Sequence, residues 1–286
     1  MQMGGPLKLI QRSHAPSRIH LSSLLLATMT LLVSAASYSQ TDQSDSEVSN
    51  SDIVKSELLD PELSASEGSS PTLFRAVYKA DYKGLPISAV GVRELTNTKP
   101  GEYKLTSSAK SFFATIEEST SFQWSGDSLV PIEYHYSRQG VGKNRLTSLN
   151  FDWDEHLLRA EEAEPWEMAL VQGTLDKLLY QVKLRTDLLT AHQAKQPWPQ
   201  LTYAVADDGK LKHYEFEVIG EEALKTPLGT INTIKATRIK DKKNRKTTFW
   251  LAPEYEFLLV KFRQQEADGD GFELRLQEAT FGDQTL

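Results

Sequence analysis

The chain has 286 residues, of which 39% are hydrophobic and 25% are charged, and this composition is that of an ordinary globular protein with one or two domains. Its formal net charge of −7 at pH 7 argues against nucleic acid or an anionic membrane as a partner that covers the whole surface. Cysteine is absent, which excludes disulfide bonds and a lipid anchor on an N-terminal cysteine.

The N-terminal segment has the layout of a secretory signal peptide. Two arginines precede a short apolar run from Leu21 to Val33, and small residues follow it. At about 1.5 Å per residue, a helix of this length cannot cross a hydrocarbon core of roughly 30 Å. We therefore expect residues 1–39 to be a signal peptide that is cleaved after Ala36 or Ser39, and we expect no transmembrane anchor after cleavage.

Residues 40–71 are rich in Ser, Asp and Glu and almost free of aromatic residues. Such a segment cannot bury enough apolar surface to offset the entropy of ordering it, so we expect a disordered acidic linker. The linker carries a charge of −7 and the signal segment +3, which leaves −3 for residues 72–286. We expect these residues to form a single β-rich domain, and export makes a nucleic-acid partner still less expected.

Alternating apolar and polar residues predict half-buried β-strands throughout this domain. The clearest run is Phe74 to Tyr82, and Pro131 to Arg138 and His213 to Gly220 repeat its pattern. Short turn motifs, most of which contain glycine, separate these runs. We expect about a dozen strands, most of them antiparallel neighbours.

Helical periodicity occurs in one segment, Gly173 to Leu189. Its apolar residues recur at helical spacing: Leu175, Leu178, Leu179 and Val182. Thr174 is a candidate N-cap, and Asp176 suits the positive end of the helix dipole. We expect one amphipathic helix, and we expect the helix not to continue into the proline-flanked Trp198.

The final third of the chain predicts four successive antiparallel strands. Pro253 has no backbone N–H, so we expect the strand that begins at Arg245 to end at Ala252 and the chain to reverse through Glu254 and Tyr255. The strands on both sides of this break are apolar on both faces. A second layer, the helix or a ligand must therefore cover the second face.

Several motifs are similar to an exported bacterial family known as domain of unknown function 3108. The motifs are "TPLGTINTIKATR", "FWLAPEYEFLLVKFRQ", "DGDGFELRLQEATF", "YKADYKGLPISAVGVREL" and "GTLDKLLYQVKLR". The resemblance extends over nearly all of Thr72 to Asp283. It implies a Gram-negative, periplasmic location in the cell envelope and a mainly antiparallel β fold, curved into an open sheet or half-barrel. It implies no reaction and no cofactor.

Two motifs suggest chemistry, but each has a simpler explanation. "GDSL" at Gly126 to Leu129 resembles the nucleophile block of a hydrolase family, yet Ser128 precedes a predicted strand and no histidine has Asp three positions before it, so we interpret the motif as a turn. Asp152, Asp154 and His156 alternate with aromatic residues. A half-buried strand with a solvent-facing acidic side explains them better than a metal site does.

The basic run Lys240 to Lys246 is a second kind of candidate site. Five cations oppose one acid there and suit an anion such as a glycan or lipid phosphate; they are Lys240, Lys242, Lys243, Arg245 and Lys246. A solvated hairpin tip is the simpler interpretation, because exposed lysines also prevent strand edges from pairing.

The leading hypothesis is a non-catalytic envelope protein whose curved sheet and helix form an apolar groove for a lipid-like or glycan ligand. The candidate groove residues are Trp153, Phe249, Trp250, Leu258 and Val260. A second hypothesis is an interaction or assembly factor that docks an envelope protein through a sheet edge or the Lys240 loop. A third is a hydrolase that uses Ser128 or the Asp152, Asp154 and His156 group. We expect no catalytic residue, metal or cofactor.

Overall fold

The computed structural model describes residues 70–82, 85–112, 114–125, 128–140, 144–162, 164–239, 245–267 and 271–286. The expected signal peptide, residues 1–39, and residues 40–69 of the expected linker lie outside this part of the chain. The division into signal peptide, linker and single domain therefore stays a prediction.

A single sheet of 16 strands makes up most of the described structure, where the sequence predicts about a dozen. The strands are β1 (Phe74–Tyr82), β2 (Leu85–Lys99), β3 (Glu102–Lys110), β4 (Ala114–Ser125), β5 (Ser128–Gly140), β6 (Arg145–Asp152), β7 (Leu157–Glu161), β8 (Trp166–Ala169), β9 (Thr174–Leu175), β10 (Leu201–Asp207), β11 (Lys210–Thr226), β12 (Gly229–Arg238), β13 (Lys246–Ala252), β14 (Leu258–Gln265), β15 (Gly271–Phe281) and β16 (Gln284–Thr285). The helix α1 spans Leu179–Gln193.

The sheet consists of two groups of strands, here called runs, and within each run every strand pairs with its neighbours in the sequence. The order is β8-β7-β6-β5-β4-β3-β2-β1-β15-β14-β13-β12-β11-β10-β9, with β16 beside β15. The first strand, β1, pairs with β15 in the middle of this order, and the pair joins the two runs. All neighbours along the path are antiparallel except β9 and β10, which are parallel.

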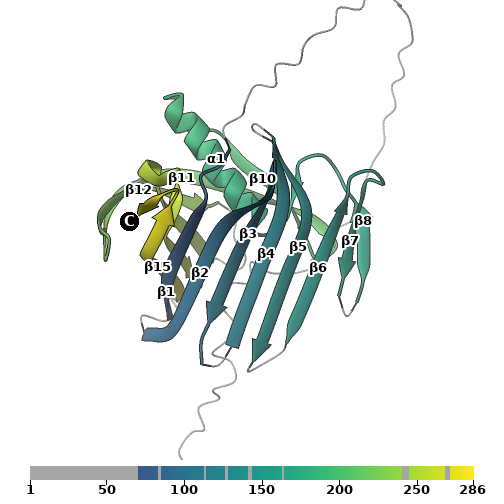
Figure 1. The fold of residues 1–286 in the computed structure, drawn as a ribbon, viewed down its shortest axis with the longest axis horizontal. Coiled ribbons are helices and arrows are strands. Elements are labelled where there is room, and N and C mark those ends of the chain that lie inside the picture. Colours follow the sequence, from purple (N-terminus) through teal and green to yellow (C-terminus); the bar gives the residue numbers. More distant parts are fainter. Residues whose placement is uncertain are drawn as a thin grey trace, which may run out of the picture.

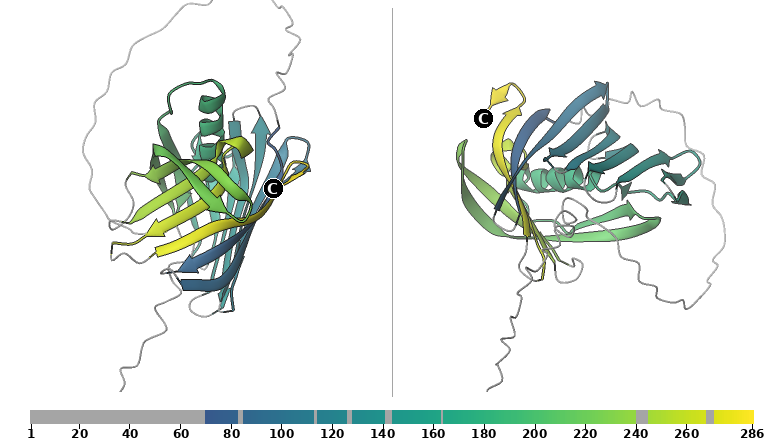
Figure 2. Two further views of the ribbon diagram at one scale, coloured as in Figure 1. Left: turned by 90° about the vertical axis from the view of Figure 1, so that its left-hand side faces the viewer. Right: turned by 90° about the horizontal axis from the view of Figure 1, so that it is seen from below.

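The sheet curls strongly and remains open, and α1 lies within its concave side (Figures 1 and 2). Strand twist favours such curling, and register shifts along several strand pairs add to it, for example between Ala80 and Asp81 and between Ser121 and Phe122. This architecture confirms the expected curved, open β fold with one helix.

The helix begins later than the sequence predicts, at Leu179 instead of just after Thr174. Thr174 and Leu175 pair with Ala204 and Val205 as β9, so their backbones belong to the sheet and Thr174 is not the N-cap. The Oδ1 atom of Asp176 instead accepts the backbone N–H groups of Leu178 and Leu179, both at 2.8 Å. These bonds satisfy two of the N–H groups that a helix start leaves without partners.

The four-strand meander β12–β15 is confirmed, and so is its break at Pro253. Strand β13 ends at Ala252, and Pro253–Tyr255 forms a single 3-10 turn. Glu256 and Phe257 follow in the left-handed region, with φ of 48° and 59°, and the N–H of Phe257 returns to the carbonyl of Ala252 at 2.8 Å. A backbone hydrogen bond therefore completes the chain reversal, and Pro253 has a structural role as the residue that ends β13.

The two faces of the meander are covered in different ways. Phe249 contacts Phe216 and Phe262, and Phe216 stacks on Tyr180 of α1, so the helix covers this face. The neighbouring Trp250 points to the opposite face by strand alternation. There its ring lies under the ammonium groups of Lys235 and Lys261, at 5.0 and 4.7 Å from the ring centroid, and its indole N–H donates to Glu222 at 2.8 Å. Long basic side chains thus cover the second face.

We expect Leu188→Ala to lower the free energy of unfolding by about 2–5 kcal/mol, because the Leu188 side chain of α1 is fully buried in the core that the helix shares with the sheet. Chemical denaturation followed by circular dichroism measures this change. Thr190→Ala is the control, since Thr190 is exposed on the same helix and its replacement should change stability by no more than about 0.5 kcal/mol. A Leu188→Ala loss as small as that of the control would show that α1 does not pack into the sheet.

Candidate functional site

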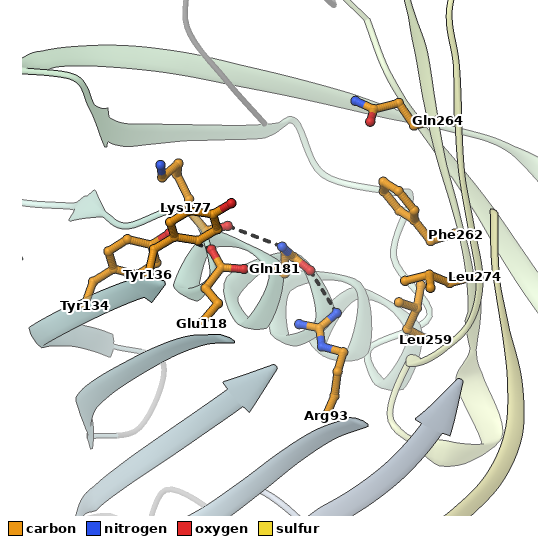
Figure 3. A pocket seen from close by; sticks show the side chains of 10 residues that line it. All are labelled: Arg93, Glu118, Tyr134, Tyr136, Lys177, Gln181, Leu259, Phe262, Gln264 and Leu274. Atoms are coloured by element: carbon orange, nitrogen blue, oxygen red, sulfur yellow. Dashed lines mark hydrogen bonds between the residues drawn. The ribbon is translucent and has the colours of Figure 1, made fainter. Parts of the chain in front are cut away.

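A small polar cavity lies between the start of α1 and the concave face of the sheet, with a volume of about 40 Å³. Its lining comes from both runs of the sheet and from the helix (Figure 3): Arg93, Glu118, Tyr134, Tyr136, Lys177, Gln181, Leu259, Phe262, Gln264 and Leu274. A second cavity of about 20 Å³ shares Arg93, Gln181 and Leu259 with the first and is otherwise mostly apolar.

Arg93 and Gln181 link the sheet to the helix across the polar cavity. The Nη1 atom of Arg93 donates to Oε1 of Gln181 at 2.9 Å, and Nε2 of Gln181 donates to the carbonyl of Lys177 at 3.2 Å (Figure 3). Strand alternation places Arg93 on the concave face, between the buried Gly91 and Leu95. The residue Arg93 is 9% exposed, so β2 brings a positively charged side chain into the interior.

Glu118 and Tyr134 form a hydrogen-bonded pair that also lines the cavity, with Glu118 beside Gln181 (Figure 3). The hydroxyl of Tyr134 donates to Oε1 of Glu118 at 2.6 Å. Burial raises the pKa of the Glu118 carboxyl, although this bond and the positive charges of Lys177 and Arg93 oppose the rise. Burial and the neighbouring carboxylate raise the pKa of the Tyr134 hydroxyl well above its ordinary value, so the phenol keeps its proton.

Asp176 fixes the start of the helix to the sheet. Besides the two helix N–H groups, it accepts a hydrogen bond from the Thr120 hydroxyl of β4 at 2.6 Å. The carboxyl is fully buried, and burial raises its pKa to about 6 in spite of these three donors. Asp176 therefore has a structural role and titrates near the middle of the physiological range.

Charged groups also join the two ends of the sheet. Asp207, at the end of β10 and 2% exposed, accepts from Lys212 at 2.5 Å and lies 3.5 Å from the ammonium of Lys177. In the next turn, Asp208 pairs with Arg145 of β6 at 3.0 Å. These pairs hold the β10–β11 turn against the far run of the sheet.

A much larger open groove lies at the other side of the helix and has a volume of about 720 Å³. It is lined by Ser125, Ser128, Leu129, Val130, Trp153, Gln172, Gly173, Leu175, Lys183, Asp187, Gln200, Thr202, Tyr203 and Ala204. Trp153 is held in place by its indole N–H, which donates to the carbonyl of Pro131 at 2.8 Å. Asp187 pairs with Lys183 and accepts from the Tyr203 hydroxyl at 3.0 Å. The groove therefore combines a fixed aromatic ring with several polar side chains.

The five predicted groove residues do not line one site. Phe249 and Leu258 line the 20 Å³ cavity, and Trp153 lines the open groove. Trp250 faces away from the helix beneath its two lysines, and Val260 is 1% exposed within the core. Because neighbouring strand residues face opposite sides, Phe249 and Trp250 could not both face the helix side.

The predicted anion site falls mostly outside the described residues. Lys240, Lys242 and Lys243 lie there. Of the other two, Arg245 lies 3.6 Å from Glu266 and is only partly exposed, while Lys246 is exposed at the start of β13. The anion-binding role of this run stays a prediction.

The prediction that Asp152, Asp154 and His156 belong to a half-buried strand is wrong for two of them. Strand β6 ends at Asp152, and the chain then turns, with His156 at a φ of 52°. The Asp152 carboxylate accepts the N–H of Glu155 at 2.9 Å and a bond from Arg159 at 3.0 Å, which lowers its pKa. Within the described residues, no group of His, Asp and Glu side chains is arranged to hold a metal ion.

Ser128 of the "GDSL" motif begins β5 and lines the open groove, while Gly126 and Asp127 lie outside the described residues. None of the described histidines lines this groove, so Ser128 has no imidazole base there. The sequence reasoning missed Arg93, Glu118 and Lys177. The one sequence signal for Arg93 was that it lies on the same side of an alternating strand as Leu95, which is buried.

Residues 77–277 match the family model described as "Protein of unknown function (DUF3108)", and the chain belongs to this family. No curated protein matches it. The solved structures that are similar to this chain include the following two. A β-barrel-like protein of domain of unknown function DUF1849 from Brucella abortus is 11% identical, with 74% of this chain and 98% of that chain covered and a TM-score of 0.46. A candidate lipoprotein from Parabacteroides distasonis is 12% identical, with 74% and 100% covered and a TM-score of 0.30.

We expect Asp176→Asn to remove part of the pH dependence of stability while keeping the Oδ1 acceptor for the helix. The pKa of Asp176 rises from 3.8 to about 6 on folding, so its contribution to stability is present below pH 3.8 and is lost as the pH rises through about 6. Relative to the variant, the free energy of unfolding of the wild type should fall by about 3 kcal/mol between about pH 4 and pH 7. Urea denaturation across this range measures the difference, and parallel profiles would contradict the assignment.

Proposed function

We propose that this member of the DUF3108 family is a non-catalytic, exported binding protein whose open groove at Trp153 takes a glycan-type component of the cell envelope. The observation that carries the proposal is the combination of groove size and lining. A volume of about 720 Å³ lies in the range of small-molecule binding sites.

The chemistry of the groove suits a carbohydrate. The C–H faces of a sugar ring pack against aromatic rings, and Trp153 offers such a ring in a fixed orientation. Sugar hydroxyls need hydrogen-bonding partners, and Ser125, Gln172, Gln200 and Thr202 supply both donors and acceptors around the ring. A ligand with many hydroxyl groups can use this lining fully, whereas a hydrocarbon would leave it without partners.

The interior favours a glycan over the lipid-like alternative. The cavities beside the helix have volumes of about 40 and 20 Å³, and spaces of this size hold roughly one to three water molecules each. An acyl chain would need the helix or several core side chains to move. The open groove needs no such change, because its walls already stand apart.

Export and a periplasmic location belong to the same proposal. The arginines before the apolar run of Leu21 to Val33 and the small residues after it support secretion through a cleaved signal peptide. None of the helices in the described part of the chain is long and apolar enough to cross a lipid bilayer. An exported protein would meet the glycans of the envelope directly.

A second candidate function, an interaction or assembly factor, is favoured by the edge of β10. Strand β10 pairs with β9 only at Ala204 and Val205, so within the described chain no strand covers Leu201 to Tyr203 on that side. This edge borders the groove, and an extended segment of an envelope protein can add to it as a further strand.

We expect Trp153→Ala to lower the affinity for soluble envelope glycans at least about tenfold, because it removes the aromatic wall of the groove. Isothermal titration with peptidoglycan fragments and with lipopolysaccharide core oligosaccharide measures the affinity. Trp198→Ala is the matched control, since Trp198 is also partly exposed but lies outside the groove.

Mass spectrometry of material that copurifies with the wild type identifies the class of ligand. A glycan that is lost from the Trp153→Ala protein supports the proposal. Equal glycan binding by both proteins, or recovery of a peptide instead, would exclude it, and the peptide would favour the assembly factor.

A further inference from the structure

A second hollow adjoins the open groove and has a volume of about 340 Å³. Its lining comes from β4, β5, β6 and the turn after β6: Gln123, Val130, Ile132, Asn150, Phe151, Asp152, Trp153 and Asp154. Trp153 and Val130 line the open groove as well, so the two spaces share these residues as a common border. The groove and this space, here called the outer hollow, therefore form one continuous surface.

The outer hollow lies on the face of the sheet that points away from α1. In β6, Leu149 is buried in the core, whereas Asn150 is exposed and Asp152 is partly exposed. Alternation along the strand places Asn150 and Asp152 on the opposite face from Leu149. Gln123 of β4 is exposed on this outer face as well. A ligand that extends from the groove into the outer hollow thus passes over Trp153.

The outer hollow has the same kind of lining as the groove. The ring of Trp153 is fixed by its indole N–H, which donates to the backbone of β5 at 2.8 Å, and the half-buried Val130 and Ile132 add apolar surface. The amides of Gln123 and Asn150 each supply donors and an acceptor. A sugar residue can therefore pack its C–H face against the apolar wall and bind its hydroxyls to the amides.

The charge around the outer hollow distinguishes neutral from anionic ligands. Asp152 and Asp154 carry its charge, and no cation is among the described residues that line it. Arg159 lies 3.0 Å from Asp152, but it also pairs with Glu155 and lies 3.3 Å from Glu167, so negative charge remains in excess. Like charges repel, and salt screens this repulsion where the groups are exposed. A phosphorylated or acidic sugar is therefore disfavoured there.

The size of the outer hollow limits what it adds to the ligand. A volume of about 340 Å³ is close to the lower end of small-molecule sites, roughly 300 Å³, so it suits one further building block. Building on the glycan proposed for the open groove, we propose that the ligand is a neutral oligosaccharide of at least two sugar residues. One residue lies in the groove, the next lies in the outer hollow, and Trp153 contacts both.

Isothermal titration with N-acetylglucosamine and with its β1,4-linked tetramer tests the chain length with neutral probes. The wild type should bind the tetramer at least about tenfold more tightly than the monomer, because only the tetramer occupies both spaces. The double variant Gln123→Ala/Asn150→Ala should lower this ratio of affinities at least about threefold, since it removes the polar partners of the second residue. Both replaced side chains are exposed, so the variant should fold like the wild type.

Gln139→Ala is the matched control, because Gln139 is an exposed amide of β5 that lines neither space, and it should keep the wild-type ratio. A wild-type gain no larger than the statistical advantage of four equivalent sugar residues would overturn the two-residue site and leave a glycan in the groove. An unchanged ratio in the double variant would overturn the outer hollow as the second position. The Trp153→Ala test of the groove can therefore succeed where this one fails.

A hyaluronan tetrasaccharide, which carries carboxylates, tests the preference for a neutral ligand. At low salt it should bind several-fold more weakly than the neutral tetramer, and Asp154→Asn should narrow the difference, because it removes one exposed negative charge from the hollow. Tighter binding of the acidic tetrasaccharide by the wild type would overturn the assignment to a neutral ligand. A wild type that binds lipopolysaccharide core oligosaccharide but neither N-acetylglucosamine probe would overturn it as well.

Discussion

The burial of α1 against the concave face of the sheet is the constraint on which the rest of the structure depends. A sheet that curls in chain order has no second sheet to cover its inner face, so one helix must fill that space. Leu179, Leu184 and Leu188 of α1 are almost fully buried and make the helix part of the core. On the side of Gln181 the cavities beside the helix are small, while the open groove lies on the side of Lys183 and Asp187.

Burying a whole helix also buries its polar start, and this explains most of the interior charges. The first N–H groups of a helix need acceptors, and Asp176 supplies one that is tied to β4 through Thr120. Lys177, one residue further, reaches Asp207 at the end of β10. The same polar cluster thus anchors the helix and holds the two runs of the sheet at a fixed separation, which sets the width of the open groove.

The sequence predicts the features that depend on a few neighbouring residues better than those that depend on contacts between distant parts of the chain. Alternation along Phe74 to Tyr82 and the missing N–H of Pro253 act within a few residues, so the strands and the break of the meander could be predicted. The start of α1 could not, because Thr174 satisfies the N-cap preference but is held in β9 by β10, which comes some 30 residues later. Tertiary pairing decided between two local options.

The residues that line the candidate sites could not be predicted from the sequence for a related reason. The polar cavity joins Arg93 of β2, Gln181 of α1 and Gln264 of β14, and no local pattern connects residues so far apart in the chain. Trp153 could be predicted as a candidate because an aromatic residue near a turn is visible in the sequence. Its polar neighbours in the groove come from the end of β4, from the residues before β9 and from the segment after α1, so the suitability of the lining for a sugar could not be predicted.

The two sites share α1 as a common wall, and this links their behaviour. Gln181 faces the polar cavity, whereas Lys183 and Asp187, within two turns of it, face the open groove. The hydrogen bond from Arg93 to Gln181 holds to the sheet the same helix that forms a wall of the open groove. Since Asp187 of this helix accepts a hydrogen bond from Tyr203 in the groove, a shift of α1 at the cavity would also displace part of the groove lining.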